Sequence, residues 1–337
     1  MNPVPSPSSL LEALPRLAGL RVLVLGDVML DIFDFCSSAE SKLIPSEKPG
    51  KRAYTAHESV RRMGGAGNVA TNLAALGART TLVGLTGNDG PHHTLVRMCE
   101  EAGIAHCLLQ DASRPTTTKT RIYIDNDYLL RKDHESTAKA DHETALSLAD
   151  EFVLQLEAGA DAVVLSDYDK GVFTGDLVAR IGARLSGRDV PVVVDFKPAN
   201  RALFAGCDLL VPNESEADAL WPGFKGADRL EEAVRGLAAA LEARRVVVTL
   251  GGRGLCGFDG RSFFHVPGNR VEAVDAVGCG DTVRAVLALG LGCGLGLREA
   301  AALANDAAAV SVQKPATATL SLDELRAFVA TKTGAAG

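Results

Sequence analysis

The stretch AVDAVGCGDTVRAVLALGLGCG, residues 273–294, decides the fold of this chain. It places a Gly-Cys-Gly loop directly before Asp281 and continues into a small-residue segment with hardly a charge, which predicts a buried helix. The two glycines around position 279 carry no side chains, so an incoming group can approach the amide hydrogens at the start of that helix. Those amides and the positive end of the helix dipole favour an anion, and we interpret the loop as a phosphate-binding site.

The composition is that of an ordinary soluble globular protein. The chain has 337 residues, of which 47% are hydrophobic and 23% are charged, so it can bury a sizeable core. Its net charge of -7 argues against sequence-independent nucleic-acid binding, which needs a basic patch. The seven cysteines include no CxxC pair and suggest neither a disulfide framework nor a zinc site, which predicts a cytoplasmic location. The longest apolar run, residues 285–297, is too short to cross a bilayer, so we expect small-molecule partners and neither nucleic acid nor membrane.

Short apolar runs alternate with helical patterns along most of the chain. They are RVLVLGD (21–27), TTLVGLTG (80–87), AVVLSDY (162–168), PVVVDFK (191–197), DLLVPN (208–213) and RVVVTLG (245–251). Strands that are apolar on both faces belong to a mostly parallel sheet that helices cover on each side. The segments 141–158, 174–186 and 227–243 are long enough to form the crossover helices. The sequence therefore predicts an α/β fold.

Two other stretches, about 32–60 and 117–136, are polar and alternating, and the second contains the hairpin-like IDNDY. We expect them to form a small β lid beside the main sheet and not a second domain. Residues 1–18 are expected to be a flexible lead-in that ends in a short helix, followed by a single domain over 19–333. The N-terminal segment has no basic start and no uninterrupted apolar core, so it does not resemble a signal peptide.

Polar residues, and in one case a glycine, follow several of the apolar strands. They are Asp27, Asp167, Asp195 with Lys197, Asn213 and Gly251. In parallel sheets, ligands bind at the carboxyl ends of the strands, so these residues are expected to lie around one site. Asp281 could accept the proton of a hydroxyl group that attacks a phosphorus atom held by the glycine loop. The alternative is that Asp281 only starts a helix, where acidic side chains are favoured. The chain has neither a GxxxxGK[ST] motif nor the H-R-D set of protein kinases, so a phosphotransferase here belongs to another class.

Residues 65–70, GAGNVA, match the glycine fingerprint of dinucleotide-binding proteins. That fingerprint works directly after a strand, and the preceding TAHESVRRM is polar and is not predicted to be one. We therefore set the dinucleotide interpretation aside. Two alternatives remain: a structural glycine turn, or a helix start at which Gly64, Gly65 and Asn68 hold a polyhydroxy ligand.

Seven short motifs follow one another along the chain in this order: GDVMLD, GGAGN, SDYDKG, DFK, PNESE, VTLGGRG and DAVGCGDT. With them the chain resembles the ribokinase-like (PfkB) carbohydrate kinases over nearly its whole length, and most of all the D-glycero-β-D-manno-heptose 7-phosphate kinases. The resemblance implies a three-layer α/β/α sandwich with a β-sheet lid, ATP and Mg²⁺, and a sugar hydroxyl as acceptor. It implies phosphorylation of the anomeric hydroxyl of heptose 7-phosphate to the 1,7-bisphosphate. The alternatives are another sugar or sugar phosphate, as in ribokinase- or fructokinase-like enzymes, and a catalytically silent sugar- or nucleotide-binding regulator.

The resemblance also implies a role for individual residues. Asp281 is expected to be the catalytic base, and the amides of Gly278, Cys279 and Gly280 the anion hole. The positions expected to hold the sugar are Asp27, Asp31, Gly64, Gly65 and Asn68. Those expected to hold the nucleotide are Asn213, Thr249, Gly251, Gly254 and Asn305, with Glu216 ordering the metal. A phosphorylated sugar needs cations, for which the candidates are Lys119, Arg121, Arg131 and Lys197; the alternative for each is a solvated surface.

The chain departs from the family pattern in two motifs. The usual T-G-A-G-D is Val-Gly-Cys-Gly-Asp here, and the D-P-K of heptose kinases is Asp195-Phe196-Lys197. Cys279 is either a reactive thiol whose pKa the helix N-terminus lowers, or a small packing residue in the place of alanine. The resemblance further implies a homodimer through the lid and leaves room for a monovalent cation. Any sugar-nucleotide step is expected to belong to another protein.

Overall fold

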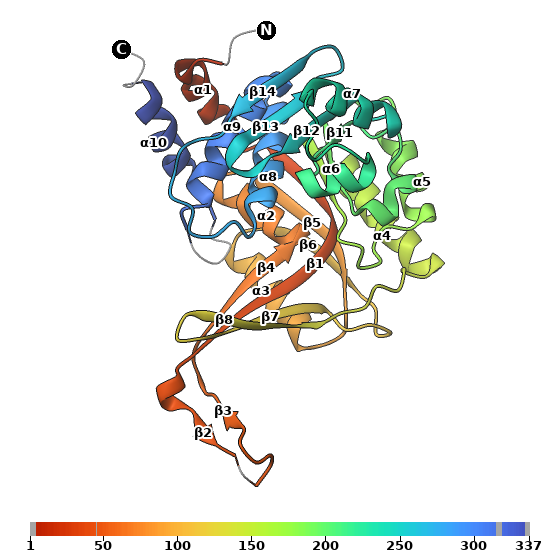
Figure 1. Cartoon of the computed structure of the whole chain (residues 1–337). Helices are drawn as coiled ribbons and strands as arrows, with labels where there is room; N and C mark the ends of the chain where they lie inside the picture. Colours follow the sequence, from red (N-terminus) through yellow and green to blue (C-terminus); the bar gives the residue numbers. More distant parts are fainter. Residues whose placement is uncertain (1–4, 45, 315–318, 334–337) are drawn as a thin grey trace.

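Strand β1 (Arg21–Cys36) runs from the central sheet into the lid (Figure 1). In the computed structural model, which describes residues 5–44, 46–314 and 319–333, its first half pairs in parallel with β5 (Arg79–Thr86) and β9 (Ala162–Ser166). Its second half, residues 28–36, pairs with β4 (Ala56–Gly65) and β7 (Thr117–Ile124). The lid is therefore a continuation of the central sheet.

The central sheet has the order β14-β13-β12-β11-β10-β9-β1-β5-β6. Its other strands are β6 (Ala105–Gln110), β10 (Val192–Asp195), β11 (Leu209–Leu210), β12 (Arg245–Thr249), β13 (Gly254–Phe258) and β14 (Phe263–Pro267). Each apolar run that predicted a strand forms one, and the neighbours from β6 to β12 are parallel. At the far edge, β13 and β14 are added antiparallel. The predicted mostly parallel sheet is confirmed.

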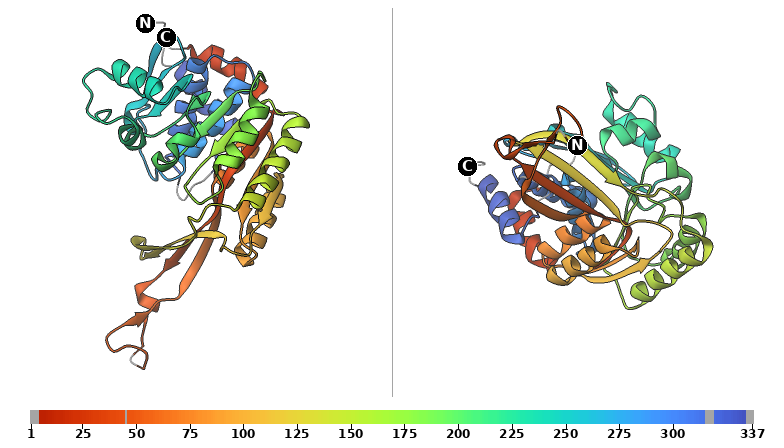
Figure 2. Two further views of the ribbon diagram at one scale, coloured as in Figure 1. Left: turned by 90° about the vertical axis from the view of Figure 1, so that its right-hand side faces the viewer. Right: turned by 90° about the horizontal axis from the view of Figure 1, so that it is seen from below.

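Alternate side chains of the strands enter two separate cores. Val22 and Val24 pack on one side of β1, and Leu23 and Leu25 pack on the other. The first side is covered by α1 (Pro7–Ala13), α2 (Ala66–Ala75), α3 (Gly90–Glu101), α8 (Cys279–Gly292), α9 (Leu297–Ser311) and α10 (Leu322–Thr333). The second is covered by α4 (His142–Glu157), α5 (Gly175–Leu185), α6 (Glu214–Leu220) and α7 (Leu230–Ala240). This is the predicted three-layer sandwich (Figure 2).

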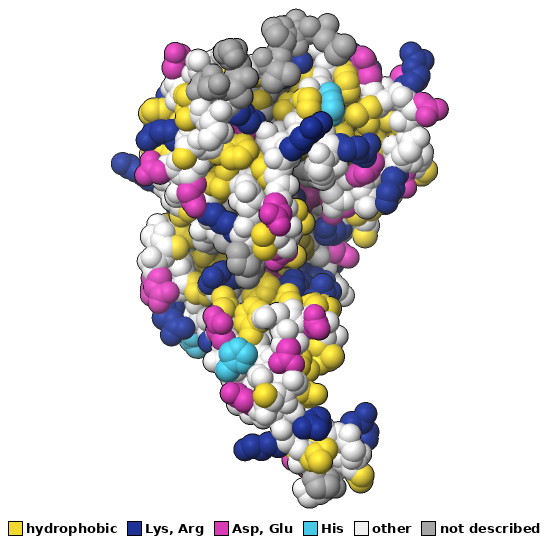
Figure 3. Space-filling model, turned by 60° about the vertical axis from the view of Figure 1, so that its left-hand side comes forward, with side chains coloured by type: hydrophobic (Ala, Val, Ile, Leu, Met, Phe, Trp, Pro, Cys, Tyr) yellow, Lys and Arg dark blue, Asp and Glu magenta, His cyan; other side chains and the backbone are white. Residues whose placement is uncertain are grey.

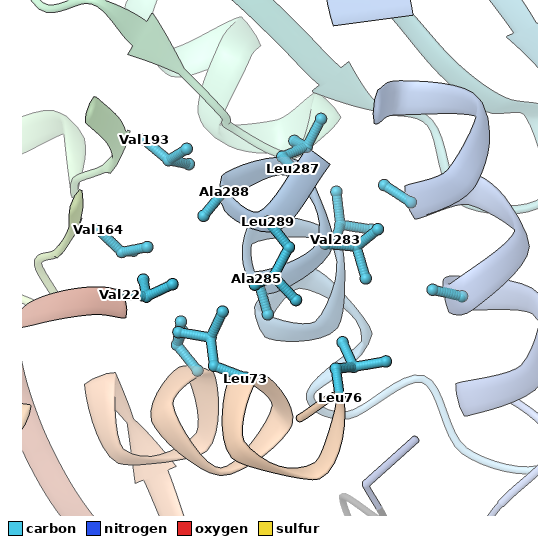
Figure 4. Close-up of a cluster of buried hydrophobic side chains, with 14 of the residues drawn as sticks. Val22, Leu73, Leu76, Val164, Val193, Val283, Ala285, Leu287, Ala288 and Leu289 are labelled. Atoms are coloured by element: carbon cyan, nitrogen blue, oxygen red, sulfur yellow. The ribbon is translucent and has the colours of Figure 1, made fainter. Parts of the chain in front are cut away.

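Helix α8 is the buried helix that the opening stretch predicts. Figure 4 shows its side chains between the sheet and helix α2; the labelled residues are Val283, Ala285, Leu287, Ala288 and Leu289 of α8, Val22, Val164 and Val193 of the sheet, and Leu73 and Leu76 of α2. Small and branched apolar side chains let the helix lie close to both layers. Among the described helices, none is both long and apolar enough to cross a membrane.

The N-terminal segment, predicted to be a lead-in that ends in a short helix, contains helix α1. Ser6 caps α1, and a 3-10 helix (Leu14–Leu17) follows it. Leu10, Leu14 and Leu17 are buried in the first core, and α1 packs against α10. Hydrophobic burial therefore orders this segment. Residues 1–4 of the predicted lead-in, and residues 45 and 315–318 of the predicted domain, lie outside the described residues.

The lid consists of residues 28–36 of β1 together with β4, β7 and β8 (Asp127–His134). Asp125 and Asn126, with φ of 51° and 71°, form the turn of the predicted IDNDY hairpin. Residues 37–44 and 46–55, which we call the arm, carry the short strands β2 (Lys42–Leu43) and β3 (Arg52–Ala53) and project away from the body (Figure 1).

The interpretation of TAHESVRRM as non-strand is wrong, because most of it forms β4. Most of β4 is exposed, so it lacks the apolar pattern of a central strand. The strand pairs antiparallel with β1 and is not the first strand of a parallel βαβ unit. The glycine fingerprint that follows it therefore still lacks the context of a dinucleotide site.

Candidate active site

Asp281 lies in the first turn of α8, and three side chains hold its carboxylate. Gly278, with a φ of +84°, lets the chain turn into the helix. Asp281 Oδ2 accepts a hydrogen bond from Asn68 Nδ2 at 2.6 Å, and Oδ1 accepts one from Tyr168 Oη at 2.7 Å. The guanidinium of Arg284 also contacts Oδ1. The carboxylate is buried, with only 6% of the residue exposed, so these partners fix its orientation.

Asn68 reaches Asp281 because α2 packs along α8. Asn72, one turn further along α2, donates to the Asn68 carbonyl at 2.9 Å and accepts a hydrogen bond from Thr282 Oγ1 at 3.1 Å. Gly65 connects β4 to α2 with a φ of +58°, and a Cβ there would lie 2.4 Å from the Asp27 carbonyl oxygen. The GGAGN motif therefore brings the side-chain amide of Asn68 onto the carboxylate of Asp281.

Arg284, which was not predicted as a site residue, contacts the carboxylate of Asp281. Its Nη1 lies 2.8 Å from Asp195 Oδ2, and its Nη2 donates to Tyr168 Oη at 2.9 Å as well as to Asp281. Burial acts to lower the pKa of Arg284, but Asp195, Tyr168 and Asp281 together hold it well above the usual value. Burial raises the pKa of Asp195 to about 6, and Arg284 opposes that rise. The signal in the sequence is a lone basic residue three positions after the acid in an otherwise apolar helix.

Asp27, predicted to hold the sugar, is used differently. It is 1% exposed, and its Oδ2 accepts hydrogen bonds from the backbone amides of Tyr168 at 2.7 Å and Lys170 at 3.1 Å. Its Oδ1 accepts a longer one from the amide of Val172. The carboxyl group therefore orders the SDYDKG loop, which presents Tyr168 to Asp281.

Asp31 lies on the lid where β1 leaves the central sheet. Its Oδ1 accepts a hydrogen bond from Arg121 Nη1 at 2.6 Å. Burial raises the pKa of Asp31, Arg121 lowers it, and the charge of Asp281 raises it further, so the two acids are electrostatically close. A Cβ at Gly64 would lie 2.2 Å from Asp31 Oδ2, so glycine at this position leaves room for the carboxylate.

A cavity of about 200 Å³ lies between the start of α8 and the carboxyl ends of β10 to β12. Its lining residues are Tyr168, Asp195, Lys197, Val211, Asn213, Glu216, Thr249, Gly278, Gly280, Asp281 and Arg284. The amides of Gly278 and Gly280 make no hydrogen bond to any described residue, so both are available to an anion. A larger cavity of about 790 Å³ lies at the amino ends of β10 to β12, and no predicted site residue lines it.

Cys279 departs from two predictions, the free amide of the anion hole and the reactive thiol. Its amide donates to the Ala276 carbonyl at 3.3 Å, so the predicted trio of free amides is reduced to two. Burial raises the pKa of its thiol, although a hydrogen bond with Ser311 lowers it. The predicted low pKa is therefore wrong, because burial has the largest effect on the pKa of this thiol and raises it. Cys279 fits the alternative of a packing residue.

Of the residues predicted to hold the nucleotide, Asn213 and Thr249 line this cavity. Asn213 caps α6, and Glu216 Oε2 accepts a hydrogen bond from the Asn213 amide at 3.0 Å. Thr249 forms a bridge with Asn213. The turn from Gly251 to Gly254 follows. Gly254 packs closely on the next strand, since a Cβ there would lie 2.5 Å from the Gly268 amide nitrogen. Asn305 Nδ2 donates a hydrogen bond at 3.0 Å to the carbonyl of Pro267, the residue before Gly268.

Lys197 contacts Glu216 and lies 5.0 Å above the ring of Tyr168. The structure therefore places it with the residues expected to hold ATP and Mg²⁺, and not with Lys119, Arg121 and Arg131 on the lid. No group of three or more metal-binding side chains occurs in the part of the chain that the structure describes. A single carboxylate such as that of Glu216 is compatible with Mg²⁺ binding. Proteins often bind Mg²⁺ through one or two carboxylates, while substrate phosphates and water complete its coordination shell.

One face of the lid is rich in basic residues. Residues paired in register on neighbouring strands share a face, and Asp31 pairs with Arg62 on β4 and with Lys119 on β7. Two residues further along, Arg121 pairs with Arg131 on β8. Lys119 contacts Asp133 and Glu135, and Arg131 contacts Asp133. Arg62 was not predicted as a site residue, and only its register with Asp31 reveals its place.

An acid held next to free amides at a helix start, with a basic lid beside it, defines a site for phosphoryl transfer to a small polar acceptor. The chain belongs to the pfkB family of carbohydrate kinases, whose family model matches residues 20–325. The predicted family is thus confirmed, and the predicted enzyme class, an ATP-dependent sugar kinase, is the class that this family defines.

Two relatives illustrate the similarity in sequence. The chain is 37% identical over 310 residues to a D-beta-D-heptose 7-phosphate kinase of Bordetella bronchiseptica, covering 92% of this chain and 96% of the relative. It is 39% identical over 319 residues to the bifunctional protein HldE of Rhodopseudomonas palustris, covering 93% of this chain. The match spans only 64% of the length of that relative.

Solved structures share the fold. Phosphofructokinase-2 from Escherichia coli, in complex with fructose-6-phosphate, aligns with a TM-score of 0.73 at 20% identity, covering 93% of this chain and 99% of its own. Ribokinase from Thermotoga maritima aligns with a TM-score of 0.68 at 24% identity, covering 92% and 99%. At these identities the likeness concerns the fold alone.

The buried Asp27 should make stability depend on pH. Burial and the charge of Asp167 raise its pKa from 3.8 to about 7, so the folded protein keeps a proton that the unfolded chain releases. The free energy of unfolding should therefore fall as pH rises from 3.8 to about 7, by on the order of 4 kcal/mol for a shift of this size. Asp27→Asn cannot ionise and should show a smaller fall in urea unfolding between pH 5 and pH 7.5. The surface variant Asp150→Asn should keep the pH dependence of the wild-type stability. An equally large fall in Asp27→Asn would contradict the raised pKa of Asp27.

Proposed function

We propose that this chain transfers the γ-phosphoryl group of ATP to the anomeric hydroxyl of D-glycero-D-manno-heptose 7-phosphate, giving the 1,7-bisphosphate and ADP. The observation that carries the proposal is the basic face of the lid, where Arg62, Lys119, Arg121 and Arg131 share a face with Asp31. A sugar that already bears a phosphate needs such cations, whereas a neutral sugar does not. The similarity to the Bordetella bronchiseptica enzyme supports the same substrate.

The acceptor hydroxyl loses its proton to Asp281 as its oxygen forms the new bond to phosphorus. Oδ2 suits this step, because among the described residues it has only Asn68 as a partner and so keeps a free lone pair. The bond between phosphorus and the β-γ bridging oxygen breaks, and ADP leaves. The amides of Gly278 and Gly280 can bind the oxygens of the transferring group, and Asp31 can accept a hydrogen bond from a second sugar hydroxyl.

We assign the donor side to Asn213, Thr249, Gly251, Gly254 and Asn305, with Lys197 and Glu216 at the phosphates. Mg²⁺ would neutralise phosphate charge there, with Glu216 as its protein ligand. The monovalent cation and the cytoplasmic location stay predictions.

Replacing the base tests the chemistry. Asp281→Asn should lower kcat by roughly 10²- to 10⁴-fold, the span of a positioned general base, because an amide cannot accept the proton. Binding of MgATP, measured by calorimetry, should stay within about threefold of wild type, since Asp281 acts on the acceptor.

The assay is ADP release over a panel of sugars and sugar phosphates that includes heptose 7-phosphate. Asp34→Asn is the control, because Asp34 lies on the other face of the lid, hydrogen-bonded to Ser59. Undiminished turnover in Asp281→Asn would remove the base assignment. Turnover of another sugar in preference to heptose 7-phosphate would replace the proposed substrate.

The lid cations should recognise the phosphate of the substrate. Arg62→Ala or Arg131→Ala should raise KM for heptose 7-phosphate by roughly 10- to 100-fold, as expected for a lost hydrogen bond between charged groups. KM for the dephosphorylated heptose should change far less, because that sugar does not use the clamp.

Arg61→Ala is the matched control, since Arg61 is exposed, adjacent in sequence and paired with Ile32 on the opposite face of the lid. It should leave the ratio of the two KM values unchanged. Equal effects of Arg62→Ala on both sugars would argue for a neutral sugar as the substrate.

We also propose a homodimer through the lid. Large exposed hydrophobic side chains gather there and on the arm: Leu43 (62% exposed), Tyr54 (41%), Tyr128 (56%), Leu129 (54%) and Leu130 (43%). Figure 3 shows hydrophobic side chains on the lid and basic ones on the arm. Leu129→Lys with Leu130→Lys should convert the dimer to a monomer in analytical ultracentrifugation, because both charges would be buried at the interface. Leu154→Lys, at an equally exposed site on α4, should not; a wild-type monomer would end the proposal.

A further inference from the structure

Arg284 is buried in a helix whose other side chains are almost all small or apolar. Its side chain is 8% exposed, and it lies between two buried acids, Asp281 and Asp195. Removing these charges from water is costly, and hydrophobic side chains of similar volume often pack there at no loss of stability. Fold stability alone therefore gives little reason for an arginine at this position.

The guanidinium joins three elements of the sandwich at one point. It contacts Asp281 on α8, Asp195 at the end of β10, and Tyr168 after β9. The network is incomplete: Arg284 Nε and Asp195 Oδ1 are buried, and neither has a hydrogen-bond partner among residues 5–44, 46–314 and 319–333. Unsatisfied buried groups lower the stability of the fold. The chain therefore keeps the contact between Arg284 and Asp281 at a cost in stability.

Arg284 also lies in the wall of the phosphoryl cavity. A Cβ at Gly280 would lie 3.5 Å from its Nη1, so the guanidinium is in contact range of the segment that offers free amides. On the base, Arg284 and Tyr168 occupy Oδ1, while Oδ2 has only Asn68 among the described residues. The two oxygens of Asp281 are therefore not equivalent.

We propose that Arg284 is a positioning residue of the transfer reaction, which binds Oδ1 of Asp281 so that Oδ2 faces the acceptor hydroxyl. Its charge has a second effect. The phosphoryl group brings negative charge into a cavity that already contains Asp195, Glu216 and Asp281, and the guanidinium offsets this repulsion at the base. The inference rests on the proposed role of Asp281 but not on which sugar is the acceptor.

The first test separates orientation from folding. Arg284→Met alone leaves two buried acids without their cation, so it is paired with Asp195→Asn. The double variant should fold, as judged by circular dichroism and thermal unfolding, and should lose roughly 10- to 100-fold in kcat, the effect of a lost charged hydrogen bond. KM for the sugar and Kd for MgATP should change less than about threefold, because neither ligand is bound by Arg284. Arg284→Lys should retain part of kcat.

The second test is chemical rescue. Arg284→Ala creates space for a small cation, and added methylguanidinium should restore kcat at least tenfold, whereas ethylammonium, with the same charge but no planar fork, should restore less. Arg245→Met is the matched control: Arg245 is a largely buried arginine paired with Asp208 at the amino ends of the strands, and its loss should lower stability and leave kcat unchanged.

The outcomes are distinct. A folded double variant with kcat within about twofold of wild type overturns the positioning role, as does a loss of kcat in Arg284→Ala that methylguanidinium does not restore. Wild-type turnover of a different sugar overturns the proposed substrate, and the Arg284 tests then run on that sugar. A wild-type protein that turns over no sugar overturns the proposed function, and the role of Arg284 with it.

Discussion

The unbroken backbone of β1 is the constraint on which the rest of the site depends. The strand hydrogen-bonds to the central sheet through residue 27 and to the lid from residue 28 onward. At ~3.3 Å per residue, Asp27 and Asp31 are held about 13 Å apart, and both side chains point to the same side because they are four positions apart along the strand. Asp27 orders the loop that carries Tyr168, and Asp31 begins the polar face of the lid. One strand therefore holds the loop that carries Tyr168 and the polar face of the lid in a fixed register.

Opposite charges are paired throughout this region. In the cavity, Arg284 lies between Asp195 and Asp281, and Lys197 contacts Glu216. At the base of the lid, Glu135 lies 2.9 Å from Lys119 and 2.8 Å from Lys170, which belongs to the SDYDKG loop. Since a buried or half-buried charge is costly without a partner, each of these acids is paired with a cation, which lies on the same helix for Asp281 and on another element for Asp195 and Glu216.

Much of the fold could be predicted because its signals are local. Apolar runs of strand length, crossover segments and the Gly-Cys-Gly loop before Asp281 are each visible in a few residues, and all of them form the expected elements. The remainder depends on contacts between distant segments. The exposed β4 lacks a core pattern, Asp27 looks like a ligand residue until its backbone partners are known, and Arg62 gains meaning only from its register with Asp31. The pKa of the Cys279 thiol is raised mainly by burial, which the sequence does not report.

The continuity of β1 also determines how the lid can move. A flap carried on loops turns about a hinge, but this lid shares hydrogen-bonded strands with the body, so a change of its angle has to spread as bending and twist along β1 and its neighbours. Asp31, Arg62 and Lys119 lie on directly paired strands, and they travel together in such a motion. Their mutual spacing is then preserved while their distance from Asp281 changes. The lid can thus bring an intact polar surface toward the base, with the elasticity of the sheet as the restoring force.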